Sequence, residues 1–270
     1  MKKNFTSLCA LCILCALCAI SCSHIDEDER LIYVQPAAIG RAVLIEDFTG
    51  QRCVNCPTAT QTIHELQEAY GDSNVVAVAI HSGAFAKSAS GKPYPLMTET
   101  GDEYYNYWEL DHQPVGIINR RSPSDYSDWG TQVYNLLKEN ALVKLSATVE
   151  YETSTRTLNV TIHSIAQEGA VDGKLQLWLT EDSIQAFQYM PDGTNNKEYI
   201  HNHVFRDAVN GTWGTDFHLD RGENRSESFT YTIAEEKDWK PENMHLVAFV
   251  YTSNGVEQVV ARPLKGKREE

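Results

Sequence analysis

The stretch DFTGQRCVNCP, residues 47–57, places Cys53 and Cys56 two residues apart. A short apolar run rich in strand-forming residues, AVLIEDFT at residues 42–49, comes before them and predicts a buried strand. The segment that follows, residues 58–71, has apolar residues at helical spacing and ends in a glycine, as helices often do. The sequence therefore predicts that the two cysteines lie between a buried strand and the amino end of a helix.

This position has a chemical consequence for the two thiols. The free N–H groups and the macrodipole at a helix amino end favour the thiolate form of Cys53, which is the attacking species in thiol–disulfide exchange. Cys56, one helical turn further on, is then placed to resolve a mixed disulfide. Pro57 suits the first helical turn, where its missing N–H is not needed.

Two other interpretations of the cysteine pair remain open. In an oxidising compartment the cysteines can form a static disulfide that fixes the start of the helix, although so short a loop gains little stability from the crosslink. Alternatively, Cys53 and Cys56 can join His81 or His112 in a copper or zinc site. Beyond residues 1–21, the chain has no second CxxC to complete such a site.

The rest of the first half continues the strand–helix alternation. The apolar runs at residues 74–82 and 115–120 predict two further strands, and residues 128–140 predict a helix with one apolar stripe. These elements predict an α/β domain at residues 41–141. Its CxxC arrangement resembles that of thioredoxin-like proteins, and this resemblance implies a cis bond at Gln113-Pro114, whose backbone would offer a substrate a strand-like edge.

The second half has a different periodicity. Short segments that alternate apolar and polar residues, separated by turn signals such as Ser253-Asn254-Gly255, predict six or seven antiparallel strands. We therefore expect an all-β, immunoglobulin-like sandwich at residues 142–264, followed by a charged tail at residues 265–270. The overall fold class is a thioredoxin-like α/β domain followed by this sandwich.

The amino-terminal residues predict export and lipidation. Two lysines, an apolar run and a small residue before Cys22 indicate a lipoprotein signal peptide at residues 1–21. Acylation of Cys22 would anchor the chain to a membrane, with residues 22–40 as an acidic tether. Cysteines 12, 15, 18 and 22 also have the spacing of an iron–sulfur motif. The signal peptide accounts for all of them, with cysteine serving as a small apolar residue.

The composition narrows the classes of partner. The formal net charge of −14 and the lack of a basic stripe argue against nucleic acid. No Ser-His-Asp or Walker-type pattern is present in the sequence, and nothing in it predicts a cofactor. The expected partners are the membrane, through the anchor, and extracytoplasmic proteins or a redox donor.

Three further groups of residues have ordinary structural explanations. His201-Asn202-His203 resembles an HNH nuclease motif only in its letters, and hydrogen bonding is the favoured role for its histidines. Trp213, between two glycines, is expected to fill a core or a domain seam. An aromatic cluster of Tyr104, Tyr105, Tyr107 and Trp108 is expected to pack in the core, with a wall of the thiol groove as the alternative.

The segments EDFTGQRCVNCP, AIHSG, PVGIINR and HNHVFRDAVNGTWG together resemble the twenty-eight-kilodalton outer-membrane lipoprotein family of Bacteroidetes-type bacteria. The resemblance covers nearly the whole mature chain and implies an outer-membrane location. Arg52 and Val54-Asn55 depart from the residues usual around a thioredoxin CxxC, and residues 121–128 show no clear strand for the usual terminal hairpin.

These observations support competing functions. The first is an anchored thiol–disulfide oxidoreductase, with Cys53 as nucleophile, Cys56 as resolver and Gln113-Pro114 as substrate guide. The second is a non-enzymatic binding or adhesion lipoprotein whose CxxC is a structural disulfide. A copper chaperone is a lesser alternative. Fold class does not decide between them.

Overall fold

The computed structural model describes residues 40–167 and 169–265. The predicted signal peptide, Cys22, nearly all of the tether and nearly all of the charged tail lie outside these residues. The helices, including two short 3₁₀ turns, are α2 (Cys56–Tyr70), η2 (Ala84–Ala86), α3 (Glu99–Tyr107), α4 (Tyr126–Leu136) and η3 (Pro241–Asn243). The strands are β1 (Val43–Thr49), β2 (Val75–His81), β3 (Val115–Ile118), β4 (Pro123–Ser124), β5 (Val143–Glu152), β6 (Thr157–Ala166), β7 (Val171–Glu181), β8 (Ile184–Tyr189), β9 (Asn195–His201), β10 (Val204–Ala208), β11 (Thr215–Leu219), β12 (Asn224–Thr232), β13 (Met244–Thr252) and β14 (Gly255–Pro263).

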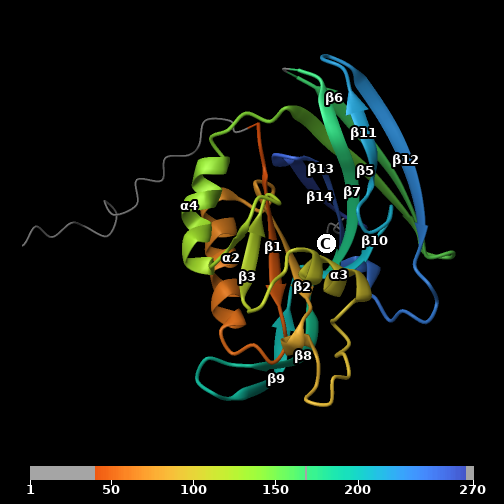
Figure 1. The fold of residues 1–270 in the computed structure, drawn as a ribbon. Coiled ribbons are helices and arrows are strands. Elements are labelled where there is room, and N and C mark those ends of the chain that lie inside the picture. Colours follow the sequence, from red (N-terminus) through yellow and green to blue (C-terminus); the bar gives the residue numbers. More distant parts are fainter. Residues whose placement is uncertain (1–39, 168, 266–270) are drawn as a thin grey trace, which may run out of the picture. The chain divides into compact units, whose positions relative to one another are not determined.

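The largest element is a mixed, nine-stranded sheet (Figure 1). Its strand order is β14-β13-β7-β10-β2-β1-β3-β4, and β11 also pairs with β7. Strands β1 and β2 are parallel, whereas β3 runs antiparallel to β1. Strand β10 joins β2 at the Val204–Ala79 pair, so one sheet continues across the boundary expected near residue 141. The chain is therefore mostly β, with few helices.

Strand β1 is buried on both faces, which explains its uninterrupted apolar sequence. Val43 and Ile45 pack with the apolar stripes of α2 and α4 on one face of the sheet. Leu44 and Phe48 face the other way, into a core with Tyr104 of α3. Helices α2 and α4 accordingly cover one face, as Figure 1 shows, and α3 covers the other.

A separate three-stranded sheet, β12-β6-β5, packs against the β13–β7 end of the large sheet. Alternate residues of β6 are buried, as expected for a sheet with one face in the core and one in water. Leu158 and Val160 of β6 share this core with Leu175 and Leu177 of β7. Two β layers therefore enclose a common core, but one of them belongs to the sheet that also carries β1–β3.

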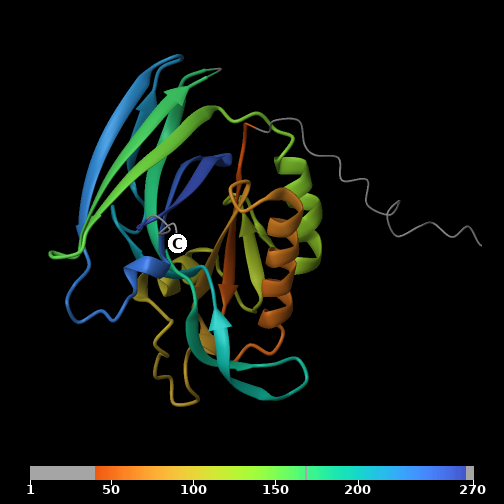
Figure 2. The ribbon, with the colours of Figure 1, turned by 180° about the vertical axis from the view of Figure 1, so that it is seen from behind.

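The third sheet is a hairpin formed by β8 and β9. Figures 1 and 2 both place it beyond the carboxyl ends of β1 and β2, which lead into the cysteine loop and the η2 segment respectively. Many residues of β9 are exposed, and its sequence NNKEYIH lacks a clear apolar alternation. Local pattern did not predict this hairpin, because its position depends on contacts with distant parts of the chain.

Most of the predicted elements are confirmed. The strands expected in both halves form, Gly71 ends α2 with a φ of 88°, and a hairpin turn at Ser253-Asn254 connects β13 to β14. Strand β4 was not predicted, although its two residues pair with β3. Strands β8 to β11 were also missed. Within the described residues, no helix is both long and apolar enough to cross a membrane.

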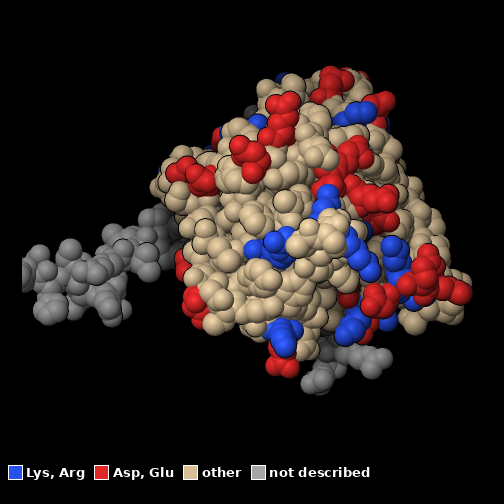
Figure 3. All heavy atoms as spheres, turned by 60° about the horizontal axis from the view of Figure 1, so that its bottom comes forward, with Lys and Arg blue, Asp and Glu red and all other residues tan. Residues whose placement is uncertain are grey.

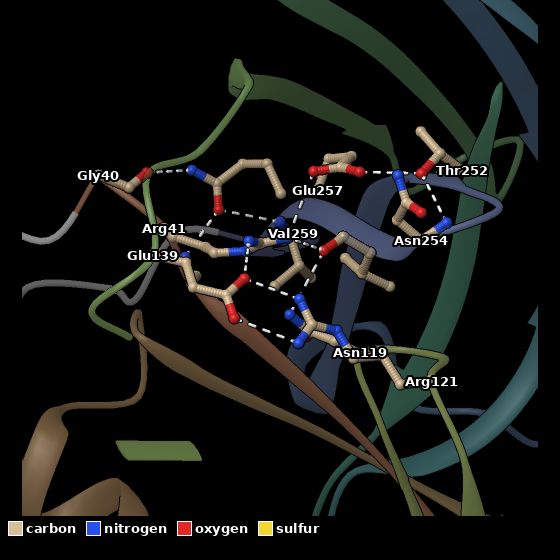
Figure 4. A network of polar contacts seen from close by, with 12 residues as sticks. Gly40, Arg41, Asn119, Arg121, Glu139, Thr252, Asn254, Glu257 and Val259 are labelled. Carbon is tan, nitrogen blue, oxygen red and sulfur yellow. Dashed lines mark hydrogen bonds and ion pairs between the residues drawn. The ribbon is translucent and has the colours of Figure 1, made fainter. Parts of the chain in front are cut away.

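A polar network joins the first strand to the last (Figure 4). Arg41, just before β1, donates to Glu139 at 2.6 Å and to the carbonyl oxygen of Val256 in β14 at 2.6 Å. Arg121 also donates to Glu139, at 2.7 Å. Because Arg41 is only 5% exposed, its own bonds are partly protected from water and from screening by salt, whereas the Arg121 bond to Glu139 is exposed.

A glycine in β3 gives a test of the packing on the helical face. A Cβ on Gly116 would lie 2.4 Å from the Trp129 ring of α4, whereas a Cβ on Gly130, inside α4, would meet nothing within 4 Å. We expect Gly116→Ala to lower the free energy of unfolding by about 1–3 kcal/mol through overpacking. Gly130→Ala is expected to raise it by up to about 1 kcal/mol through helix propensity. Urea denaturation of both variants measures the two changes, and a Gly116→Ala variant as stable as the wild type would contradict the packing described here.

Candidate functional site

The two cysteines form a disulfide at the predicted place. Cys56 is the first residue of α2, and Cys53 lies in the loop between β1 and α2, with the two Cα atoms 5.4 Å apart. Each cysteine is only 2% exposed, whereas Val54 between them is 44% exposed. The loop therefore presents its intervening residues to solvent and keeps its sulfurs inside.

The amino end of α2 has few groups that compete for its free N–H donors. Asn55 at the N-cap makes no side-chain cap hydrogen bond, the first turn contains no acidic residue, and Pro57 stands at its start. The helix end therefore retains its positive partial charge beside the disulfide. This part of the sequence-based prediction is confirmed.

The hairpin of β8 and β9 covers the cysteine loop. Gln188, which is 2% exposed, donates from Nε2 to the carbonyl oxygen of Cys53 at 2.8 Å. The backbone N–H of Tyr189 donates to the carbonyl oxygen of Gln51 at 2.9 Å, and Gln51 Nε2 donates to that of Phe187 at 3.1 Å. Sequence reasoning missed this cover, and Gln188 in particular.

The segment around η2 holds the other side of the same loop. The backbone N–H of Arg52 donates to the carbonyl oxygen of Phe85 at 3.0 Å, and its guanidinium donates to that of Lys87 at 3.1 Å. A Cβ on Gly50 would lie 2.5 Å from the Phe85 carbonyl carbon, so only glycine permits this approach. The cysteine loop is thus bonded to chain segments on two sides.

The predicted cis bond at Gln113-Pro114 is present. The side chain of Gln113 is nearly buried, and its Nε2 donates to the carbonyl oxygens of Thr49 at 2.8 Å and Ser82 at 3.0 Å. These two carbonyls lie at the ends of β1 and β2, directly before the cysteine loop and the η2 segment. In this structure Gln113 joins neighbouring strand ends through its side chain.

Two buried histidines lie near the disulfide. A cavity of about 20 Å³ is bordered by Cys56, His81, Gln188 and His201, among others. The rings of His81 and His201 are 5.2 Å apart, and neither nitrogen of His81 has a hydrogen-bond partner within the described residues. Burial lowers the pKa of both histidines, that of His201 to about 4, so both are neutral at neutral pH.

The histidines do not complete the metal site considered from the sequence. His112 lies at the surface, where its ring nitrogens face Asp111 and Asp125 rather than the cysteines. His81 borders the same cavity as Cys56, but that sulfur is bonded to Cys53. Over the part of the chain that the structure describes, no group of three or more His, Cys, Asp or Glu residues is arranged to hold a metal ion.

The His201-Asn202-His203 motif has a structural role. Strand β9 ends at His201 and His203 has a φ of 57°, so the two histidines do not lie on one alternating strand. The Asn202 side chain accepts from the N–H of Ser183 at 2.9 Å, and the N–H of His203 donates to Asp182 at 2.6 Å. These bonds fix the turn from β9 into β10.

The aromatic cluster is partly confirmed as core. Tyr104 is fully buried and packs with Trp178 and Trp213. The contact between Trp213 and Tyr104 joins α3 to the β-rich half, as expected of a seam residue. Tyr107, however, is 61% exposed. The cluster therefore has a buried part and a part that faces solvent.

Comparison with known proteins identifies the family. A family model described as outer membrane protein Omp28 matches residues 101–267. This chain belongs to the Omp28 outer membrane protein family. The match confirms the family resemblance seen in the sequence and assigns the protein to the outer membrane. Its residues include Gln113 and Pro114 but begin after both cysteines.

Two solved structures are similar to parts of this chain. HBP35 of Porphyromonas gingivalis is similar with a TM-score of 0.64 and 11% identity, over 85% of this chain and 78% of that one, which shows the fold alone. A domain of the outer membrane lipoprotein Omp28 from Porphyromonas gingivalis is 28% identical over 46% of this chain and 89% of the domain, with a TM-score of 0.34. A search of curated proteins found no match.

Asp47, in β1, gives a pH-dependent test of burial beside the cysteine loop. It is 1% exposed, its Oδ1 has no hydrogen-bond partner within the described residues, and burial raises its pKa from 3.8 to about 7. Between these values the unfolded chain has released the Asp47 proton and the folded chain has kept it, so the free energy of unfolding falls as pH rises.

The Asp47→Asn variant lacks this titration. We expect its free energy of unfolding, minus that of the wild type, to rise by about 3 kcal/mol between pH 4 and pH 7. Urea denaturation of both proteins at several pH values measures this difference, and the buried histidines contribute equally to both. If the free energies of unfolding of the two proteins changed equally with pH, Asp47 would not be protonated in the folded protein at pH 5 to 6.

Proposed function

We propose that this Omp28 family member is a lipid-anchored outer-membrane lipoprotein with a non-enzymatic binding role, in which Cys53–Cys56 is a structural disulfide. The burial of both sulfurs beneath the hairpin of β8 and β9 is the observation that carries this proposal. Exchange requires in-line approach of a thiolate to one of these sulfur atoms. In this arrangement such an approach requires displacement of the hairpin.

The strand order supports a thioredoxin-like origin for residues 41–141. The order β2-β1-β3-β4, the parallel β1–β2 pair, the CxxC at the start of α2 and the cis bond before β3 all agree with that assignment. We propose that residues 142–264 form a sandwich that has been joined to this unit through β10. The thioredoxin-like unit then serves as a scaffold, because a fold alone does not imply its usual chemistry.

Thiol–disulfide exchange is the second candidate. Two observations favour it: the position of the cysteines at the uncompensated amino end of α2, and the cis Gln113-Pro114 bond that thioredoxin-like proteins use beside their disulfide. In that mechanism Cys53 would attack and Cys56 would resolve, while Gln113-Pro114 would guide an extracytoplasmic protein or a redox donor. The hairpin would have to open in each cycle. No contact of the disulfide favours the copper-chaperone alternative.

The expected partners follow from location and charge. The anchor on Cys22 would hold the protein at a membrane, where extracytoplasmic proteins are the available partners. The net charge of −14 disfavours nucleic acid. Acidic and basic side chains are interspersed on the face shown in Figure 3, which is typical of a surface that contacts proteins or small molecules rather than a polyanion.

The disulfide hypothesis predicts protection from reductants. We expect dithiothreitol to leave Cys53–Cys56 oxidised in native buffer and to reduce it in urea, as measured by acid quench, alkylation and mass spectrometry of the purified full chain.

Variants test the same hypothesis. Gln188→Ala, which removes the bond to the Cys53 carbonyl, should speed native reduction by roughly tenfold if the lost hydrogen bond lowers the free energy of hairpin opening. The double variant Cys53→Ala/Cys56→Ala should lose about 2 kcal/mol of stability. Insulin-reduction turnover by the wild type that Cys53→Ser abolishes would favour exchange instead.

The lipid anchor has its own test. We expect Cys22→Ala to release the protein from the membrane fraction, because the acyl chains would have no attachment site. Cys18→Ala, a cysteine within the predicted signal peptide, is the matched control and should stay in the membrane fraction. Fractionation with metabolic labelling by a fatty acid measures both. Membrane retention of an unlabelled Cys22→Ala protein would contradict lipid anchoring at this residue.

A further inference from the structure

A second cavity lies apart from the disulfide, and neither cysteine lines it. This cleft has a volume of about 930 Å³, within the range of small-molecule sites. Its aromatic wall consists of Tyr107, Trp108 and Trp213. Its cationic lining consists of Arg120, Arg121 and Lys174.

The aromatic wall is held in place by hydrogen bonds. The indole N–H of Trp213 donates to Glu103 Oε1 of α3 at 2.9 Å, and the Trp213 ring centre lies 4.5 Å from that of Tyr107. The Tyr251 hydroxyl donates to the carbonyl oxygen of Trp213 at 2.7 Å. The wall therefore presents aromatic surface whose orientation is fixed before a ligand binds.

The loop that carries Trp213 packs closely against the backbone of β7. Gly211 and Gly214 have φ values of 87° and 71°, in the left-handed region that favours glycine. A Cβ on Gly214 would lie 2.2 Å from the carbonyl oxygen of Leu175. Close packing and glycine geometry thus fix the loop independently of the hydrogen bonds above.

A strained turn supplies two of the three cations, Arg120 and Arg121, and β7 supplies Lys174. Asn119 and Arg120 are consecutive non-glycine residues with φ values of 50° and 53°, each of which costs of the order of 1 kcal/mol or more. The Asn119 side chain accepts from the Leu44 N–H at 2.7 Å, and its carbonyl oxygen accepts from the Val256 N–H at 2.8 Å. These bonds hold the turn, and Figure 4 shows Arg121 directed toward Glu139 beside it.

Arg120 has unused hydrogen-bonding capacity. Its side chain is nearly buried, and its Nε donates to Glu46 at 3.1 Å. Its Nη atoms make no well-aligned hydrogen bond within the described residues, and the Tyr104 and Tyr251 hydroxyl groups are nearby weak acceptors. The guanidinium instead lies over aromatic rings, 4.3 Å from the centre of the Tyr251 ring. A guanidinium normally uses its paired Nη donors on a carboxylate or a phosphate.

We propose that this cleft binds a small carboxylate whose ring stacks on Tyr107 and Trp213. The carboxylate would lie among Arg121, Lys174 and the edge of the Arg120 guanidinium. A singly charged anion fits better than a phosphate dianion, because Glu103 shares the lining and Arg121 and Lys174 already pair with Glu139 and Asp216. Acidic sugars and aromatic acids both have this shared chemistry.

This proposal rests on the proposed binding role and gives it a ligand class. It uses neither Cys53 nor Cys56, so the reductant experiment and the ligand titration measure different properties. Evidence that the disulfide takes part in exchange would not contradict ligand binding in the cleft. A cleft that binds none of the probes would not contradict a structural disulfide. The failure of either proposal is therefore distinguishable from the failure of the other.

The test is a calorimetric titration of the detergent-solubilised full chain with matched probes. Glucuronate and phenylacetate each carry a ring and a carboxylate, glucose and phenylacetamide lack the carboxylate, and acetate lacks the ring. We expect at least one ring-bearing carboxylate to bind saturably, with its neutral counterpart and acetate each at least about tenfold weaker. Binding of glucuronate alone identifies a sugar ligand, and binding of phenylacetate alone an aromatic one. The proposal is overturned if neither binds, or if a neutral counterpart or acetate binds equally well.

Surface variants locate the site without disturbing the core. Arg121→Gln and Lys174→Gln should each weaken binding by roughly fivefold to tenfold, and Tyr107→Ala by roughly fivefold. The controls Arg262→Gln and Tyr134→Ala change exposed residues that do not line the cleft and should stay within about twofold of wild type. Thermal unfolding of each variant confirms that it is folded. Equal weakening in cleft and control variants, or none in the three cleft variants, would refute this location.

Discussion

The pairing of β10 with β2 is the constraint on which the rest of the structure depends. The Ala79 N–H donates to the carbonyl oxygen of His203, and Val204 is the register partner of Ala79. Because β8 and β9 directly precede β10, this pairing brings their hairpin to the ends of β1 and β2, above the cysteine loop. Because Trp213 follows β10 closely, the same pairing brings it to Glu103 of α3. One junction between distant segments thus determines both the cover of the disulfide and the aromatic wall of the cleft.

Two opposing effects act on the sulfur atoms at the start of α2. The helix amino end stabilises a nearby thiolate by about 0.3–2 kcal/mol. Removing an unpaired charge from water costs several kcal/mol, and each cysteine is only 2% exposed. Within this closed arrangement the desolvation term is the larger one, so a buried thiolate is disfavoured at either cysteine. Helix position alone, which suggested a nucleophile at the sequence level, does not include this term because burial depends on the distant hairpin.

The sequence predicted the elements that depend on local contacts and missed those that depend on contacts between distant segments. β1, α2 and β2 were predictable because their periodicity reflects burial on local faces, and the Gly71 C-cap and the Ser253-Asn254 turn have local signals. The cysteine pair and Gln113-Pro114 were recognisable as motifs. The hairpin could not be found in this way, because β9 is mostly exposed and Gln188 looks like any surface glutamine until its contact with the Cys53 carbonyl is known. Arg120 was equally hidden, since an arginine after a strand normally points to solvent. Asn119 favours a left-handed conformation locally, but Arg120 does not, so the sequence did not reveal two consecutive left-handed residues.

A contribution to the stability of the fold does not by itself explain why Arg120 and Glu46 form a buried ion pair. Glu46 is fully buried, burial raises its pKa, and the neighbouring Arg120 guanidinium opposes that rise. Replacing such a pair by apolar side chains of similar volume is often neutral or stabilising, by about 1–4 kcal/mol. The turn that positions Arg120 adds two strained residues to this desolvation penalty. Aromatic rings around the guanidinium recover part of it, through contacts worth about 0.5–2 kcal/mol each. A structural role alone would be met more simply by apolar side chains at both position 46 and position 120. A cation that borders a rigid aromatic cleft, with Nη donors that make no well-aligned hydrogen bond within the described residues, is instead the arrangement expected where an anionic ligand completes the hydrogen bonds.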